Sequence, residues 1–229
     1  MLILAIDTAL DACAAAVLDT SAGVIAQESQ AMKRGHAEAL MPLIARVMGS
    51  AELGFTALDR IAVTVGPGSF TGLRVGISAA RGLALAAGKP AVGLTTLSAY
   101  AAAIVGQSRS APVISAIDAR HDHVYFQIVA SDGSQLVRPK VASIDEAIAA
   151  SQFGAPHLVG NAASILAERW PKDAPQPIAV DAQAAPDIAW VAWLGAAANP
   201  DTTPARPFYL KAPDAKPAAL PPLAQAAGS

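Results

Sequence analysis

The first third of the chain alternates short apolar runs with one segment of helical periodicity. The opening run, 2–7, is apolar up to Asp7 and predicts a strand buried on both faces. Two further strand-like runs follow at 13–19 and 23–30, separated by a polar turn that contains glycine. In 36–48 the apolar residues recur every three or four positions, which predicts an amphipathic helix. The pattern therefore predicts three consecutive strands and then a helix.

A glycine-rich segment separates the next predicted strand from the next helix. The β-branched run 61–65 leads directly into Gly66-Pro-Gly-Ser-Phe-Thr-Gly72, and a helical stretch over 73–87 follows. After a stop at Gly88-Lys-Pro90, a strand is predicted at 91–94, with a further helix running towards Val105. This part of the chain has the order strand, glycine loop, helix.

The second half repeats the opening pattern in a degenerate form. An apolar run over 113–118 ends in Asp118, as the first run ends in Asp7, and 124–130 follows as its antiparallel return. Asp132-Gly133 predicts the next hairpin turn. Helices are predicted at 144–150, 162–170 and 188–198, with a short strand at 157–159. The fold class expected is α/β, with two related lobes.

Composition shifts place the boundaries between these parts. A linker is expected near 106–110, between a first lobe over 1–105 and a second lobe over 111–210. Residues 211–229 are rich in proline and alanine, and we expect this tail to be disordered.

Overall composition narrows the functional classes. Hydrophobic residues make up 53% of the 229 residues and charged residues 15%, and the mean hydropathy of +0.40 excludes a disordered chain. A net charge of −2 argues against a broad basic surface for RNA, so any RNA contact is expected to be indirect. Cys13 is the single cysteine and cannot form an internal disulfide. We expect a cytoplasmic protein without a membrane span.

The glycine loop is the first candidate for chemistry. Gly66 and Gly68 tolerate unusual backbone angles, and Ser69 and Thr71 supply hydroxyls at a helix start, so the loop could hold the phosphate of a nucleotide. It matches neither the Walker A nor the Rossmann pattern. A tight turn with close backbone packing explains the same residues equally well.

The residues at the ends of the two first strands form the second candidate. Asp7 with Thr8, and Asp118 with Arg120, could hold a magnesium–phosphate group between the lobes. The aspartates could equally cap turns, and Arg120 could be a surface residue. No third ligand lies near His121 and His123, so no metal site is expected.

Five segments together resemble the TsaB family, also called YeaZ. They are Ile3-Leu-Ala-Ile-Asp-Thr8, Gly35-His36, Gly66-Pro-Gly-Ser-Phe-Thr-Gly-Leu-Arg74, Gly93-Leu-Thr-Thr-Leu97 and Ile117-Asp-Ala-Arg120. The resemblance covers about residues 1–210 and is far more specific than an isolated glycine pattern.

The resemblance implies both a fold and a function. The fold is the duplicated actin/Hsp70-like ATPase (ASKHA) fold, here with a reduced second lobe. The function implied is that of a non-catalytic subunit, which works with the transferase TsaD and the ATPase TsaE in making N6-threonylcarbamoyladenosine at position 37 of tRNA. This chain would require no cofactor of its own, although ATP or ADP could bind at the complex interface. Two copies are expected to pair when TsaD is absent.

Several positions depart from those of an active relative. The metal-binding histidine pair of TsaD corresponds to Thr96 and Tyr100, which are not suitable ligands. Asp118 is followed by Ala-Arg-His rather than glycine, and the turn expected beside the adenosine, 158–161, has one glycine. The alternative function is a self-sufficient ATPase or kinase that uses Asp7 and Asp118. A protease ranks last, because Ser69 has no evident base.

The resemblance also implies a partner surface on the helices 36–48 and 73–87, which meet the corresponding helices of TsaD in family members. The simpler alternative is that these helices only cover their own sheet. The expected contact residues are Met41, Met48, Val75, Gly76, Ala79, Gly82 and Leu83.

Overall fold

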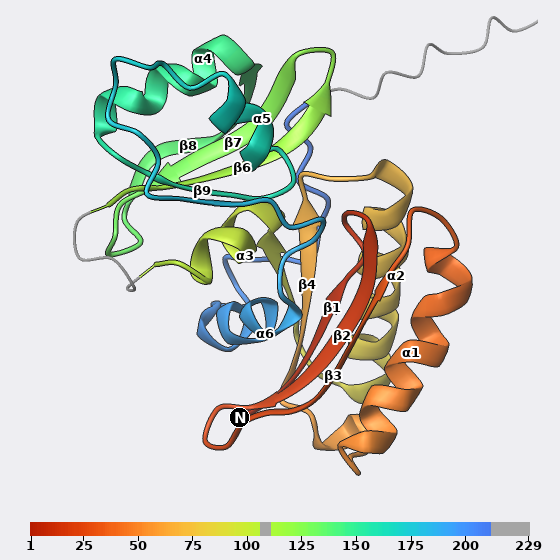
Figure 1. Ribbon diagram of the computed structural model, residues 1–229. Helices are drawn as coiled ribbons and strands as arrows, with labels where there is room; N and C mark the ends of the chain where they lie inside the picture. Colours follow the sequence, from red (N-terminus) through yellow and green to blue (C-terminus); the bar gives the residue numbers. More distant parts are fainter. Residues whose placement is uncertain (106–110, 212–229) are drawn as a thin grey trace, which may run out of the picture.

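Two five-stranded mixed sheets, each with its own helices, form the two lobes of the protein (Figure 1). The structure is a computed structural model that describes residues 1–105 and 111–211. The strand order is β3-β2-β1-β4-β5 in the first sheet and β10-β9-β6-β7-β8 in the second. This arrangement confirms the predicted two-lobed α/β fold.

The first sheet begins with the three predicted strands. β1 (Leu2–Asp7) pairs antiparallel with β2 (Ala12–Asp19), which pairs antiparallel with β3 (Gly23–Ala31). β4 (Arg60–Gly66) then pairs parallel with β1, and β5 (Ala91–Thr95) pairs parallel with β4. Because β1 and β4 are parallel neighbours, their carboxyl ends lie at the same edge of the sheet.

The second sheet repeats this order. β6 (Val113–Arg120), β7 (His123–Val129) and β8 (Gln135–Ser143) form an antiparallel series. β9 (His157–Val159) pairs parallel with β6, and β10 (Ala179–Asp181) pairs parallel with β9. β6 is therefore the counterpart of β1, and its carboxyl end meets the other lobe as that of β1 does.

Helices cover both faces of the first sheet. α1 (His36–Ser50) and α2 (Phe70–Ala87) lie side by side on one face, with the short 3₁₀ helix η1 (Phe55–Ala57) after α1. The opposite face is covered by α6 (Ile188–Ala197), which comes from the far end of the chain (Figure 1). The last helix thus packs on the first sheet.

Shorter helices complete the second lobe and the junction. α4 (Ile144–Ile148), η2 (Ala149–Phe153) and α5 (Ala163–Glu168) pack around the second sheet. α3 (Thr96–Ala102) belongs to the first lobe by sequence but contacts β6, β7 and α6. α3 therefore contacts both sheets, and α6 packs against it on the first-lobe side.

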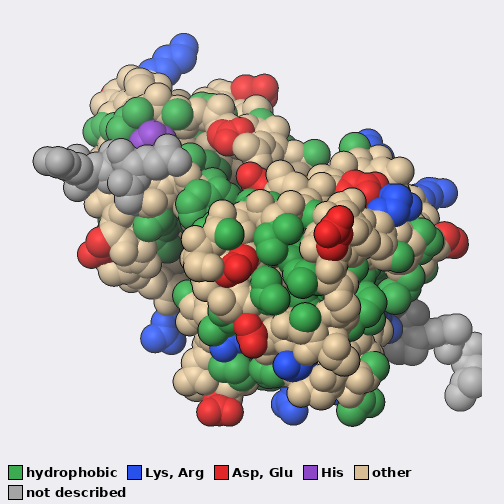
Figure 2. All heavy atoms as spheres, turned by 90° about the horizontal axis from the view of Figure 1, so that it is seen from below, with side chains coloured by type: hydrophobic (Ala, Val, Ile, Leu, Met, Phe, Trp, Pro, Cys, Tyr) green, Lys and Arg blue, Asp and Glu red, His purple; other side chains and the backbone are tan. Residues whose placement is uncertain are grey.

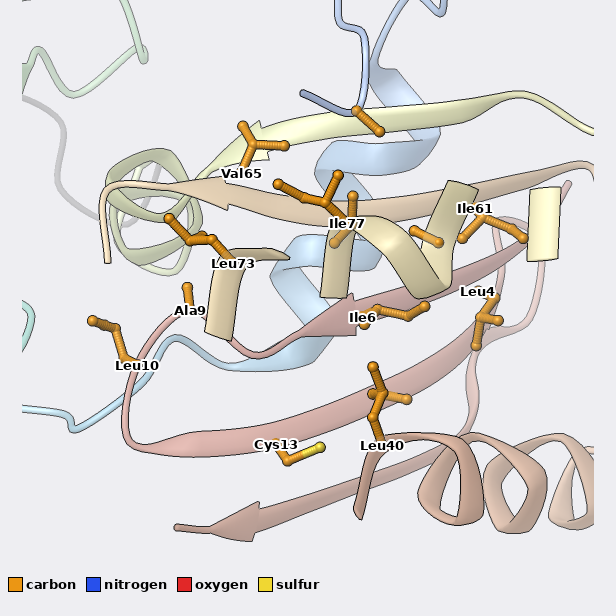
Figure 3. Close-up of a cluster of buried hydrophobic side chains, with 14 of the residues drawn as sticks. Leu4, Ile6, Ala9, Leu10, Cys13, Leu40, Ile61, Val65, Leu73 and Ile77 are labelled. Carbon is orange, nitrogen blue, oxygen red and sulfur yellow. The ribbon is translucent and has the colours of Figure 1, made fainter. Parts of the chain in front are cut away.

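One hydrophobic cluster extends through this junction. In the first lobe, Ile6 of β1 and Ile77 of α2 point into it (Figure 3). The same cluster takes in Leu97 of α3 and, from the second sheet, Ile117 and Val159. Each large aliphatic side chain buried in this way contributes roughly 1.5–3 kcal/mol. The continuous apolar packing fixes the position of one sheet relative to the other.

The last described residues return to the first lobe. Gly93 N donates to Thr203 O at 2.8 Å, and Phe208 N donates to Val65 O at 2.8 Å. This brings the segment up to Lys211 alongside β5 and the end of β4. The predicted linker at 106–110 and all of the predicted disordered tail except Lys211 lie outside the described residues. No helix among the described residues is long and apolar enough to span a bilayer.

Arg60, the first residue of β4, holds the end of α6. Its guanidinium donates to the carbonyl oxygens of Gly195 at 2.8 Å, Ala196 at 3.2 Å and Ala198. These carbonyls lack partners within the helix, and a cation there also interacts favourably with the helix dipole. The start of β4 is thereby tied to a helix more than 130 residues later in the chain.

Replacement of Arg60 by methionine tests this tie. Arg60→Met keeps most of the apolar volume but leaves three partly buried carbonyls without their donor, and we expect the free energy of unfolding to fall by about 1.5–3 kcal/mol. Urea denaturation followed by circular dichroism measures the change. Arg138→Met, an exposed arginine on β8, is the control. Equal stability of the two variants would show that the clamp contributes little.

Candidate functional site

A cleft of about 650 Å³ opens between the two lobes. It forms where the β1–β2 turn and the glycine loop of the first lobe face the end of β6 in the second. The lining residues of these three segments are Ala9, Leu10, Asp11, Gly68, Ser69, Phe70, Thr71, Ile117, Asp118, Ala119 and Arg120, and the rest are Tyr125, Asn161, Tyr209 and Lys211.

The glycines of the loop allow it to pack directly on the β1–β2 turn. A Cβ atom on Gly68 would lie 2.4 Å from the carbonyl oxygen of Ala9, and one on Gly72 would lie 2.1 Å from that of Thr8. Ser69 N donates to the same Ala9 oxygen at 2.7 Å. This is the close backbone packing that the sequence left open as an alternative to phosphate binding. The N–H of Ser69 is used within the protein.

The hydroxyl groups around the loop also have internal roles. Ser69 caps α2, because its Oγ accepts from Gly72 N at 3.3 Å. Thr8 Oγ1 donates to Gly72 O at 2.7 Å, and a Cβ on Gly76 would lie 2.4 Å from Thr8 Oγ1. Gly66 has a φ of 115°, a backbone conformation that favours glycine. Of the predicted loop residues, Gly68, Ser69 and Thr71 line the cleft, whereas Gly66 and Thr8 do not.

Asp7 is fully buried behind the cleft rather than exposed in it. Its Oδ1 accepts from Ala9 N at 3.0 Å and from the Thr64 hydroxyl, and its Oδ2 has no partner among the described residues. Burial raises the pKa of Asp7 above its ordinary value, and these hydrogen bonds only partly oppose the effect. The structure therefore does not bring Asp7 and Asp118 together around one ligand.

Asp118 does face the cleft, at the start of an unusual turn. Asn161 Oδ1 accepts from its backbone N–H at 2.9 Å, and its own Oδ1 accepts from Arg120 N at 2.7 Å. Arg120, His121 and Asp122 have φ angles of 64°, 52° and 56°, and each such non-glycine residue costs roughly 1 kcal/mol or more. This turn places Arg120 in the lining of the cleft.

The positions that correspond to a metal site hold other groups. Thr96 is buried, and the hydroxyl of buried Tyr100 donates to Gln183 O at 2.9 Å. Burial raises the pKa of Tyr100, so the phenol stays protonated. Within the described residues, no group of three or more His, Cys, Asp or Glu side chains is arranged to hold a metal ion.

Two aromatic residues at the cleft were not predicted from the sequence. The ring of Phe70 stacks on that of Tyr209, with centroids 5.6 Å apart and planes at 28°. The guanidinium of Arg74 lies 3.7 Å from the centre of the Phe70 ring. Asp11 and Lys211, both cleft residues, were missed as well, whereas Asn161 lies in the turn 158–161 that was expected beside a nucleotide. Phe70 lies inside the glycine motif, but its stacking partner Tyr209 comes from the C-terminal segment, which is distant in the sequence.

The predicted partner surface needs a correction on α1 and α2. Met48 is 3% exposed, and Gly76 is buried against Thr8, so both face the interior of the lobe. Met41 is 47% exposed, and a Cβ on Gly82 would meet open space. Leu85, which the sequence analysis did not select, is 86% exposed. The remaining surface, with the half-buried residues, comprises Met41, Val75, Ala79, Gly82, Leu83 and Leu85.

Charged side chains are scattered on the molecular surface shown in Figure 2. Lys and Arg side chains on that face stand singly among Asp and Glu, with apolar side chains between them. That face therefore lacks the clustered basic residues of a broad nucleic-acid surface.

Sequence comparison finds relatives that are named for tRNA modification. The family model of TsaD, tRNA N6-adenosine threonylcarbamoyltransferase, matches residues 18–188. The tRNA threonylcarbamoyladenosine biosynthesis protein TsaB of Haemophilus influenzae is 38% identical over 141 residues, which are 62% of this chain and 56% of that protein. The match to Escherichia coli TsaB is 36% over 126 residues, 55% of this chain and 54% of the relative. The matched region thus spans about half the length of these relatives.

Two longer comparisons cover nearly the whole chain. An uncharacterized protein of Mycobacterium tuberculosis is 32% identical over 222 residues, 95% of either chain. A Pseudomonas aeruginosa crystal structure, described as similar to peptidase YeaZ, has a TM-score of 0.76 at 26% identity and covers 92% of this chain and 99% of that one. YeaZ from the same organism has a TM-score of 0.71 at 26% identity, covering 91% and 99%. The chain belongs to the TsaB/YeaZ family.

Proposed function

We propose that this chain is a non-catalytic subunit that binds a TsaD-type transferase and supports formation of N6-threonylcarbamoyladenosine at position 37 of tRNA. The names of its relatives support the pathway. The observation that carries the proposed role is the surface of exposed apolar and small residues on α1 and α2. In addition, Asp7, the first-lobe carboxylate that an ATPase would use, is buried. The TsaE ATPase acts in the same pathway, and a cytoplasmic site of action follows from the tRNA substrate.

The geometry of the cleft favours a non-catalytic role. In the alternative, an ATPase or kinase, two carboxylates and the loop amides would act on magnesium and phosphate. Asp7 is buried and bonded to Thr64, and the N–H of Ser69 is bonded to Ala9. The ATPase alternative rests on one observation, which is that Asp118 and Arg120 line the cleft.

The α1/α2 surface, comprising Met41, Val75, Ala79, Gly82, Leu83 and Leu85, fits a helical partner. Leu85 is 86% exposed, and its burial against a partner would contribute roughly 1.5–3 kcal/mol. Gly82 offers no side chain, so another helix could approach closely. The two helices lie side by side on the same face of the first sheet (Figure 1). The same surface would pair two copies of this chain when the transferase is absent.

Complex formation and stimulation are expected together. Purified chain should co-purify with its cognate TsaD-type protein, and threonylcarbamoylation of tRNA should require its addition. Affinity capture followed by measurement of the modified nucleoside, with this chain present or omitted, gives both results. Modification at the same rate without this chain would contradict the proposal.

Gly82→Arg should weaken that complex at least tenfold, about 1.4 kcal/mol, because a long charged side chain would enter the helix contact. Arginine has a higher helix propensity than glycine, and the site has open space, so the fold should be retained. Isothermal titration calorimetry measures the affinity. Gln135→Arg, on exposed β8 of the other lobe, adds the same charge as a control. Unchanged affinity for Gly82→Arg would remove α2 from the interface.

Asp7→Asn distinguishes a structural role of the Asp7 carboxyl from a role in ATP hydrolysis. The folded pKa of Asp7 is raised, so the folded state holds its proton more tightly, and wild-type stability should decline as pH rises above the ordinary value of 3.8. The variant lacks this titration, so urea denaturation between pH 4 and 8 should show its stability rising relative to that of the wild type. Stimulation of the transferase should persist. ATP turnover by the isolated chain that Asp7→Asn abolishes would instead support the ATPase alternative.

A further inference from the structure

Three planar groups are in contact at the first-lobe side of the cleft. The Arg74 guanidinium covers one side of the Phe70 ring at 3.7 Å, and Tyr209 stacks with the same ring at 5.6 Å between centroids. Tyr209 lines the cleft and remains 44% exposed. A partly exposed aromatic side chain, Tyr209, therefore borders the cleft.

The rest of the cleft supplies groups that could bind a phosphate and groups that could form hydrogen bonds with the polar edge of a base. Arg120 lines the cleft and belongs to a turn of three residues with positive φ. Asn161, Ser69 and Thr71 add amide and hydroxyl groups. Proteins bind unpaired nucleotides with this combination of an aromatic stacking surface, an arginine and short polar side chains.

The charge of the cleft limits how many phosphates it accepts. Two acidic residues, Asp11 and Asp118, and two basic residues, Arg120 and Lys211, line it. The N–H of Ser69 already donates to Ala9 O, so this amide of the glycine loop is not offered to a phosphate chain. This balance favours a ligand with one phosphate over a di- or triphosphate.

We infer that the cleft binds an unpaired nucleotide of an RNA strand, with its base on Tyr209 and its phosphate near Arg120. This inference goes beyond the proposed function, because it assigns direct RNA contact to a chain for which the sequence predicted only indirect contact. A single site of this kind requires no broad basic surface, because base–aromatic stacking contributes to the affinity in addition to the phosphate contact. The Phe70–Tyr209 stack also fixes the C-terminal segment to the glycine loop, so its structural role must be tested separately.

Binding of a fluorescently labelled seven-nucleotide single-stranded RNA to the isolated chain tests the inference by anisotropy. Tyr209→Leu should weaken binding about tenfold or more, whereas Tyr209→Phe, which keeps the ring, should stay within about twofold. Thermal unfolding of both variants reports on the structural role of the stack. Equal RNA affinity for wild type and Tyr209→Leu, or no binding by the wild type, overturns the inference.

The salt dependence of binding tests the phosphate contact. Arg120→Asn suits a residue with positive φ and removes one cation, so it should weaken RNA binding and lower the log–log salt slope by about 0.7. Arg138→Gln, on exposed β8 away from the cleft, should leave the slope unchanged. Competition with AMP and ATP shows whether the cleft prefers a nucleotide of an RNA strand or a free nucleotide. Tighter binding of ATP than of the RNA would contradict the charge argument. The transferase is absent from these assays, so their failure leaves the proposed complex untouched.

Discussion

The contact between the glycine loop and the β1–β2 turn determines much of this structure. Gly68 and Gly72 approach the carbonyl oxygens of Ala9 and Thr8 so closely that no side chain fits between them. This contact sets where α2 begins and closes the first-lobe side of the cleft. A loop that could have been shaped for phosphate is used to join a helix to the sheet.

The partner surface and the cleft share this support. α2 begins at the loop, and α1 begins at His36, whose Nε2 lies 3.1 Å from Leu10 O in the same turn. On the opposite face of the sheet, Arg60 holds the end of α6. The first sheet is therefore covered and held on both faces, and α1 and α2 lie on the outside of the first lobe. This arrangement suits a protein that acts by binding.

The sequence predicted most strands of the two lobes and their repeated pattern, because apolar runs ending in Asp7 and Asp118 are local signals, but it assigned no range to β8 and did not predict β10. It did not predict that α6 packs on the first sheet, since that contact joins parts of the chain far apart in sequence. Met48 and Gly76 were assigned to the surface because apolar and small residues suit either side of a helix. Tyr209 was missed as a cleft residue because it, too, is far in sequence from the residues that it contacts.

Hydrogen–deuterium exchange of this chain, alone and with the TsaD-type transferase, tests most directly whether its role is to bind through the first lobe. The account predicts slower exchange in α1 (His36–Ser50) and α2 (Phe70–Ala87), with β8 (Gln135–Ser143) unchanged. Protection confined to the second lobe, with α1 and α2 exchanging as in the free chain, would contradict it.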